Sequence, residues 1–243
     1  MIKSRLAAAA AVTILSMAAG SASAAAYVGS IPLAPNTNQF ITKFFGNGVS
    51  IEGWYGANLY LVGGPATLTI EYFGAEAGFS NTFSWNAGVL YSHVGGAGGN
   101  AGTFVDNIPV GSLGGEDVVA ANTVINNVAS GLLPFIFGTG GNNGTVANGA
   151  NNDNTNNAPN FFVSFDNNYV LDTNVNGSTA GSGQSVFLFF DDSGAQNDDN
   201  HDDMVIRISI TGGYFTVPEP GALALVGLAL TGLGLARRRV ARR

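Results

Sequence analysis

The sequence predicts an all-β protein, an antiparallel β-sandwich for which a jelly-roll-like connection is one option. Short apolar or alternating runs, each bounded by turn residues, recur along the chain, and β-branched and aromatic residues dominate them. Sixteen phenylalanines are available for a core, and 35 glycines among 243 residues indicate many turns. No long stretch shows the period of an amphipathic helix.

The best of these runs, residues 66–73, places Leu68, Ile70 and Tyr72 on one face and Thr67, Thr69 and Glu71 on the other. Two interruptions are expected: a short helix starting near Glu116 and ending at Gly131, and an exposed Gly- and Asn-rich loop over residues 138–160. The predicted strands are residues 57–62, 66–73, 81–85, 88–93, 132–137, 160–165, 185–190 and 204–210.

The N-terminus predicts a secretory signal peptide over residues 1–24. Lys3 and Arg5 precede an apolar stretch (residues 6–19), and small residues follow it. These are the parts of an export signal, with cleavage expected between Ala24 and Ala25. The predicted partners here are the general export machinery and signal peptidase.

The C-terminus predicts a membrane anchor over residues 217–243, which leaves residues 25–216 as the ectodomain. Pro218-Glu219-Pro220 precedes an uncharged apolar stretch (residues 221–236), sixteen residues that can span a thin bilayer as a helix. A basic cluster follows and should stay in the cytoplasm, so both ends of the chain predict the same topology. The cluster comprises Arg237, Arg238, Arg239, Arg242 and Arg243.

Pro-Glu-Pro, an apolar helix and a terminal arginine cluster, in this order, resemble the PEP-CTERM sorting signal of Gram-negative bacteria. The resemblance implies processing by an exosortase, a membrane-embedded cysteine protease, and association with exopolysaccharide. It implies a precursor tethered to the inner membrane and then a cell-surface or extracellular protein. A plain tail anchor is the alternative. In both cases the prolines hold Glu219 in an extended segment, the shape that a protease binds.

Charge and cysteine content exclude several classes of function. Residues 25–236 hold two basic and all sixteen acidic residues, a net charge of −14, which disfavours binding to nucleic acid. The chain has no cysteine, so it has no disulfide, thiol nucleophile or cysteine-ligated metal.

One acidic run could carry chemistry. It lies between the last two predicted strands, which should form a hairpin, and its carboxylates suit calcium, although the spacing is not that of an EF-hand. The alternatives are a solvated acidic turn that caps a strand, with some aspartates bonded to loop amides, and, for His201, a role as loop donor rather than metal ligand. Arg207 is expected to pair with one of these acids or with Asp166. The six aspartates are Asp191, Asp192, Asp198, Asp199, Asp202 and Asp203.

The Asp-Asp-Asn-His-Asp-Asp run at residues 198–203 also resembles a recurrent loop in PEP-CTERM precursors and related bacterial surface domains. The predicted function is therefore a non-enzymatic surface or extracellular-matrix protein. Its rivals are a calcium-dependent glycan-binding module and a secreted polysaccharide-active enzyme.

Enzymatic constellations are few. A catalytic triad would need His93 or His201, and Glu71 with Glu76 is the one candidate carboxylate pair, although Glu71 should be solvated. Four aromatic residues allow a sugar-stacking face but are expected mainly in the core: Trp54, Tyr55, Tyr60 and Trp85.

Overall fold

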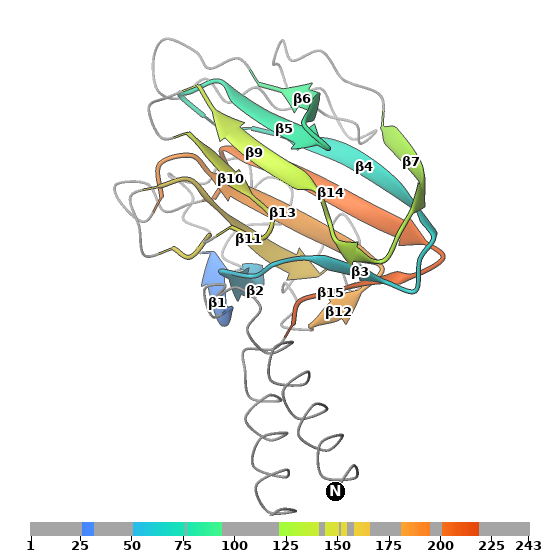
Figure 1. Cartoon of the computed structure of the whole chain (residues 1–243). Coiled ribbons are helices and arrows are strands. Elements are labelled where there is room, and N and C mark those ends of the chain that lie inside the picture. The colour runs from blue at the N-terminus through green and yellow to red at the C-terminus, as the bar shows by residue number, and fades with distance from the viewer. Residues whose placement is uncertain are drawn as a thin grey trace, which may run out of the picture. The chain divides into compact units, whose positions relative to one another are not determined.

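In the computed structural model of the chain, the described residues are 26–31, 51–75, 77–93, 122–140, 144–150, 152–154, 158–165, 181–194 and 201–218 (Figure 1). Residues 24–218 form a compact unit. Every element in the described part is a strand and every pairing is antiparallel, which confirms the all-β class. The signal peptide, the cleavage residues Ala24 and Ala25, the apolar stretch at 221–236 and the arginine cluster lie outside the described residues.

The largest sheet has seven strands, and its centre is made by segments far apart in the chain. The hairpin expected around the acidic run is confirmed, since Phe187 pairs with Arg207 and Phe190 with Met204. In spatial order the strands are β1 (Tyr27–Ile31), β2 (Ile51–Tyr55), β11 (Asn160–Phe165), β13 (Ser185–Asp191), β14 (Met204–Thr211), β4 (Ala66–Gly74) and β7 (Thr123–Val128).

A second sheet of four strands packs on one face of the first. Its order is β10 (Thr145–Ala147), β9 (Phe135–Thr139), β5 (Asn81–Trp85) and β6 (Gly88–Ser92), and Figure 1 shows β9 and β5 lying over β13, β14 and β4. Phe137 stacks on Phe190 with ring centroids 4.7 Å apart, and Phe135 meets Phe161 edge-on at 5.2 Å. These ring pairs join the two sheets across a shared core.

A third, smaller sheet lies beside these two. Its strands are short, in the order β12 (Ser182–Gly183), β15 (Tyr214–Thr216), β3 (Tyr60–Val62) and β8 (Gly131–Leu132). Leu61 and Phe215 pair across β3 and β15 and are buried in the same core as the large sheet. The last strand of the fold is therefore held in place both by backbone pairing and by burial.

The expected alternation along β4 is confirmed: Leu68, Ile70 and Tyr72 are buried, and the residues between them are half-buried. Strands β11 and β13 differ, because they are buried on both faces, with Phe162 and Phe189 as well covered as Phe161 and Phe190. This explains why their sequences are nearly continuous apolar runs rather than alternating ones.

The helix expected up to Gly131 is wrong where the structure describes it, because residues 123–128 form β7. Val124 is exposed while Ile125 and Val128 pack against the core, and β-branched residues favour this edge position beside β4. Glu116 lies outside the described residues.

The loop expected over residues 138–160 is also wrong in part. Its described residues include β10, which pairs with β9. Asn148 is buried: its side-chain oxygen accepts from Leu59 N at 2.9 Å, and its amide donates to the carbonyls of Leu59 and Leu133 at 2.8 and 2.9 Å. The asparagines that suggested a solvent-exposed loop thus include one that bridges strands inside the fold.

Within the described residues, no helix is both long and apolar enough to cross a bilayer.

Candidate functional site

A cluster of polar side chains closes one end of the large sheet, where β11 begins, β13 ends and β14 begins. Asn160, the first residue of β11, is the register partner of Asp191, the last of β13. Phe190 pairs with Met204, so the residues after Asp191 and before Met204 converge at this edge. We call this set the polar cluster: Asn81, Asn160, Asp191, Asp192, His201, Asp202 and Asp203.

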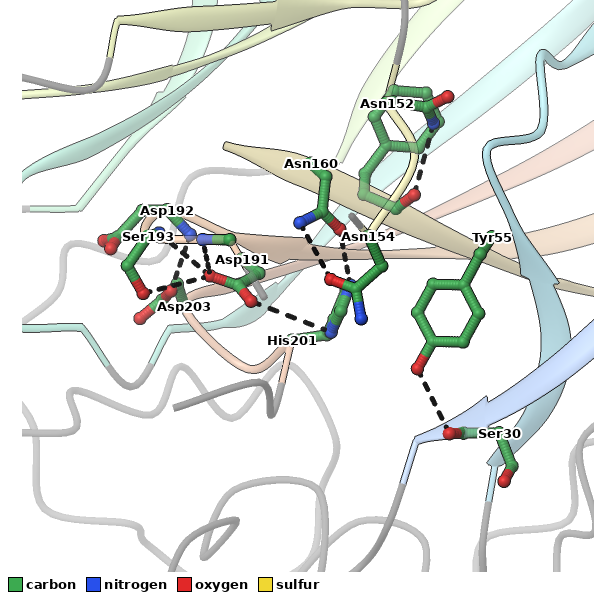
Figure 2. Close-up of polar contacts among 12 residues, drawn as sticks. Ser30, Tyr55, Asn152, Asn154, Asn160, Asp191, Asp192, Ser193, His201 and Asp203 are labelled. Carbon is green, nitrogen blue, oxygen red and sulfur yellow. Dashed lines mark hydrogen bonds and ion pairs between the residues drawn. The ribbon is translucent and has the colours of Figure 1, made fainter. Parts of the chain in front are cut away.

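Asp191 shapes the turn that leaves β13. Its Oδ1 accepts hydrogen bonds from the backbone N–H of Ser193 at 2.9 Å and of Gly194 at 2.7 Å, and from the Ser193 hydroxyl at 3.2 Å (Figure 2). Aspartate commonly makes such local bonds in turns. The carboxylate is fully buried, so these donors supply part of the solvation that water would otherwise give.

Asp192 and Asp203 connect the hairpin to the second sheet. The Asp192 N–H donates to Asp203 Oδ2 at 2.7 Å. The Asn81 amide, at the start of β5, donates to Asp192 Oδ2 at 2.9 Å and to the Asp203 carbonyl at 3.2 Å. Asn81 is fully buried and lies 111 residues from Asp192 in sequence, so this contact is a tertiary link between the two sheets.

His201 is the most confined member of the polar cluster. Its ring lies 5.4 Å from Tyr55 and 6.1 Å from Phe162, both in edge-on geometry, and its side chain is fully buried. Nε2 lies 2.6 Å from Asn160 Oδ1, and an amide oxygen can only accept, so the proton of the neutral ring sits on Nε2. Burial lowers the pKa of His201 from 6.5 to about 3.

At neutral pH His201 is therefore uncharged. Its Nδ1 lies 4.0 Å from Asp191 Oδ2, which is too long for a hydrogen bond and, with a neutral ring, is not an ion pair (Figure 2). The sequence-based alternative of a loop donor is confirmed for Nε2. Its backbone φ of 56° is in the left-handed region, so the loop turns sharply at this residue.

The interpretation of the acidic run as a turn with aspartates bonded to loop amides is confirmed at Asp191, but most aspartates at its base are buried rather than solvated. Asp191, Asp192 and Asp202 are buried, and Asp203 is half-buried. Among the described residues, no group of three or more Asp, Glu and His side chains has a geometry that could hold a metal ion. Asp198 and Asp199 lie outside the described residues, so the six predicted ligands are seen only in part.

The fold ends directly at the Pro-Glu-Pro sequence. Val217 follows β15 and is buried, whereas Pro218 is exposed. A family model, the PEP-CTERM protein-sorting motif, matches residues 216–240. The chain carries a PEP-CTERM sorting signal. No curated protein and no solved structure matches the chain.

The motif implies that an exosortase processes the chain as a surface protein, and it is consistent with export by way of a membrane-anchored precursor. Of the predicted sorting residues, Pro218 is the last one that the structure describes, and Glu219 and Pro220 lie beyond it.

In the described part of the chain Arg207 pairs with Glu71 rather than with an aspartate of the acidic run, and Asp166 lies outside the described residues. Arg207 has Glu71 on β4 as its register partner, with Nε 2.6 Å from Glu71 Oε2, and its guanidinium lies 5.1 Å from the Phe73 ring centroid. Glu71 also accepts from the Asn122 amide at 3.2 Å. Glu71 was expected to be solvated, but its side chain is only 15% exposed and is held by this pair, because β14 adds to β4 rather than remaining an isolated hairpin.

The aromatic residues considered for a sugar-stacking face are mostly core residues. Trp54, Tyr55 and Trp85 are buried, and Tyr60 is half-buried. Of the two histidines, His93 is also buried, and its Nε2 contacts the Ala77 carbonyl at 3.3 Å.

Two members of the polar cluster were missed by the sequence reasoning, Asn81 and Asn160. Each is the first residue of a strand that was predicted correctly, and each is fully buried. A polar residue at the first position of an otherwise apolar strand was the available signal. Its meaning depends on which strands become neighbours, and that is a property of the topology.

Proposed function

We propose that this protein is a non-catalytic β-sandwich of the cell surface or extracellular matrix, released by an exosortase and associated with exopolysaccharide. The observation that carries the proposal is the sorting signal placed directly after the last strand of the fold. No further domain lies between the ectodomain and the signal, so cleavage there frees the sandwich itself.

The absence of catalysis is supported by how the chemically capable side chains are used. His201 and His93 are buried, and Glu71 is engaged by Arg207 and Asn122. Asp191 and Asp192 accept hydrogen bonds that fix the turn and the second sheet. A general acid or base must reach its substrate within hydrogen-bond distance, and these groups are committed to the fold instead.

Release is tested with the full-length protein in its producing strain. Replacing Pro218, Glu219 and Pro220 together by alanine should leave the protein in the membrane fraction, whereas the parent appears in the medium or matrix. A matched control replaces three exposed residues of the fold, Val28, Val89 and Val124, by alanine. Equal release of the parent and the sorting-motif variant would contradict the proposal.

Association with polysaccharide needs its own test. The released protein, mixed with exopolysaccharide purified from the same strain, should sediment with it at physiological salt. An unrelated acidic protein of similar net charge should stay in the supernatant. If both proteins sediment to the same extent, the proposed association with exopolysaccharide is wrong, whereas the proposed release by an exosortase is unaffected.

The second candidate function is a calcium-dependent glycan-binding module. It is favoured by the convergence of Asp191, Asp192 and Asp203 at the base of the acidic run, where oxygen ligands are dense. The described residues alone do not make a metal site, so this candidate depends on Asp198 and Asp199.

Calcium binding is measured on the released protein after chelation. A site that binds only the folded state should raise the free energy of unfolding by about 2.7 kcal/mol at a hundredfold excess of calcium over Kd. Magnesium should do less, because it demands octahedral geometry. The double variant Asp198→Asn with Asp199→Asn should lose the response. Melting temperatures that calcium leaves unchanged would reject this candidate and favour the first.

A further inference from the structure

The fold and the sorting signal share residues at their junction. The signal matches from Thr216, which is the last residue of β15, and Val217 is buried beside it. The Val217 N–H donates to the Gly181 carbonyl at 2.9 Å, and the Thr216 hydroxyl donates to the same oxygen at 3.1 Å. Phe215, one residue earlier, is fully buried in the core.

Strand β15 is paired on both of its edges. Thr216 lies opposite Ser182 of β12 on one side and opposite Tyr60 of β3 on the other. A protease that binds an extended segment uses backbone hydrogen bonds along it, as strand-adding domains do. The motif supplies few of these itself, because Pro218 and Pro220 have no N–H. A protease would therefore bind the backbone just before the motif, but in the fold that backbone is already paired with β12 and β3.

We propose that β15 must detach from β12 and β3 before exosortase cuts at the Pro-Glu-Pro motif, so that local opening of the small sheet sets the rate of release. The inference rests on the proposed cleavage at that motif. It assigns to Phe215, Thr216 and Val217 a role in timing release that is separate from recognition of Pro218 to Pro220.

The small sheet is suited to such opening. Strands β12 and β8 have two residues each, and β15 and β3 have three. Short strands open more readily than the long central strands of a sheet. Two glycines, Gly212 and Gly213, lie between β14 and β15 and give the connection between these strands more backbone freedom than other residues would.

The decisive experiment locks β15 in place. Because the chain has no cysteine, the double variant Ser182→Cys with Thr216→Cys can form one disulfide within the chain, and non-reducing gels identify any disulfide between chains. These residues are direct cross-strand partners, and such pairs have Cα separations within the range that a disulfide spans. Release of the full-length protein is followed by pulse-chase in the producing strain, with and without dithiothreitol.

The oxidised double variant should stay in the membrane fraction, and reduction of the same variant should restore its release. The reduced form is the matched control, since it differs only in the lock. Resistance of both forms to limited proteolysis is measured alongside, which separates a block of release from a failure to fold. Equal release of the oxidised and reduced forms would overturn the inference.

A second variant tests the same idea without a disulfide. Inserting Gly-Gly-Ser-Gly-Gly-Ser between Val217 and Pro218 supplies free backbone beside the motif while β15 stays paired. Release should become several-fold faster than in the parent, and the insertion should restore release of the oxidised double variant. If the insertion changes the release rate of neither the parent nor the oxidised double variant, the inference is overturned.

These outcomes are distinguishable from failure of the proposed function. If replacing the three motif residues by alanine blocks release while the lock and the insertion have no effect, exosortase cleavage stands and the role of β15 falls. If the alanine variant is released normally, the proposed cleavage fails first.

Discussion

Acid should destabilise this protein through His201, and the size of the effect follows from its burial. The pKa of His201 is lowered by burial to about 3, whereas an exposed histidine in the unfolded chain titrates near 6.5. Between these values the unfolded chain binds a proton that the folded chain does not. Stability is therefore unaffected above pH 6.5 and is lost as the pH falls below it.

At pH 5 the loss depends only on the distance from 6.5, since the folded protein is still unprotonated at His201. Each pH unit costs about 1.36 kcal/mol, so the penalty at pH 5 is about 2 kcal/mol. That is a large share of the ~5–15 kcal/mol by which domains are usually stable. Asp191 Oδ2 lies 4.0 Å from Nδ1, and the same carboxyl group is present in parent and variant.

The assay compares the parent with His201→Gln, whose side-chain amide can still donate to Asn160 Oδ1 but does not titrate. Urea unfolding of the released protein is measured at pH 7 and pH 5 with a chelator present. The parent should lose about 2 kcal/mol more than the variant between the two pH values. Parallel losses in the two proteins would refute the reasoning that His201 is buried and neutral.

Three further outcomes are expected. Phe137→Ala should cost about 3–5 kcal/mol of unfolding free energy in urea titrations, because the ring stacks on Phe190 between the sheets, whereas Phe137→Leu should cost clearly less. Glu71→Gln should cost about 1–3 kcal/mol, because it leaves the Arg207 charge half-buried and poorly paired; an equal loss for Thr69→Ala on the same face of β4 would contradict this. The released protein should begin at Ala25, which N-terminal sequencing checks, and retention of Met1 would contradict the signal peptide.

The strands that the sequence predicted well are those whose apolar pattern is long enough to read locally. Residues 81–85 and 160–165 match β5 and β11 at both ends, and β13 and β14 each extend one residue beyond their predicted runs. These segments bury one or both faces, and their buried positions hold mostly apolar residues, so the sequence there is densely apolar. The prediction was reliable there because the local sequence pattern and the tertiary burial favour the same strand.

The strands that were missed have little local signal. Strand β12 is Ser-Gly, and β15 is a three-residue segment that borders the sorting signal. Strand β2 contains Gly53, whose place in the sheet is a packing requirement: a Cβ there would lie 2.3 Å from the Val163 carbonyl and 2.6 Å from the Phe162 ring. Contacts of this kind are visible only when the neighbouring strand is known.

The polar cluster was predicted as a set of charges but not as a structure. The sequence shows six aspartates between two strands, and it predicts either a bound cation or a turn in which some aspartates are bonded to loop amides. In the structure, backbone N–H groups donate to Asp191, and the side-chain amide of Asn81, from the second sheet, donates to Asp192. The partner of Arg207 was misjudged for the same reason, because Glu71 lies 136 residues away in the chain.

The strand order also constrains how an exported chain folds. In the centre of the large sheet β14 lies between β13 and β4. During synthesis β4 therefore precedes its partner β14 by more than a hundred residues. Closing such long loops is slow, and sheets built on them fold in about milliseconds to seconds rather than microseconds. Strand β14 ends at Thr211, and the sorting signal begins at Thr216. The segment that completes the sheet and the segment that carries the sorting signal are thus synthesised almost together. Until then the edges of β4 and β13 that face β14 have no partner, and unpaired strand edges of this kind invite aggregation.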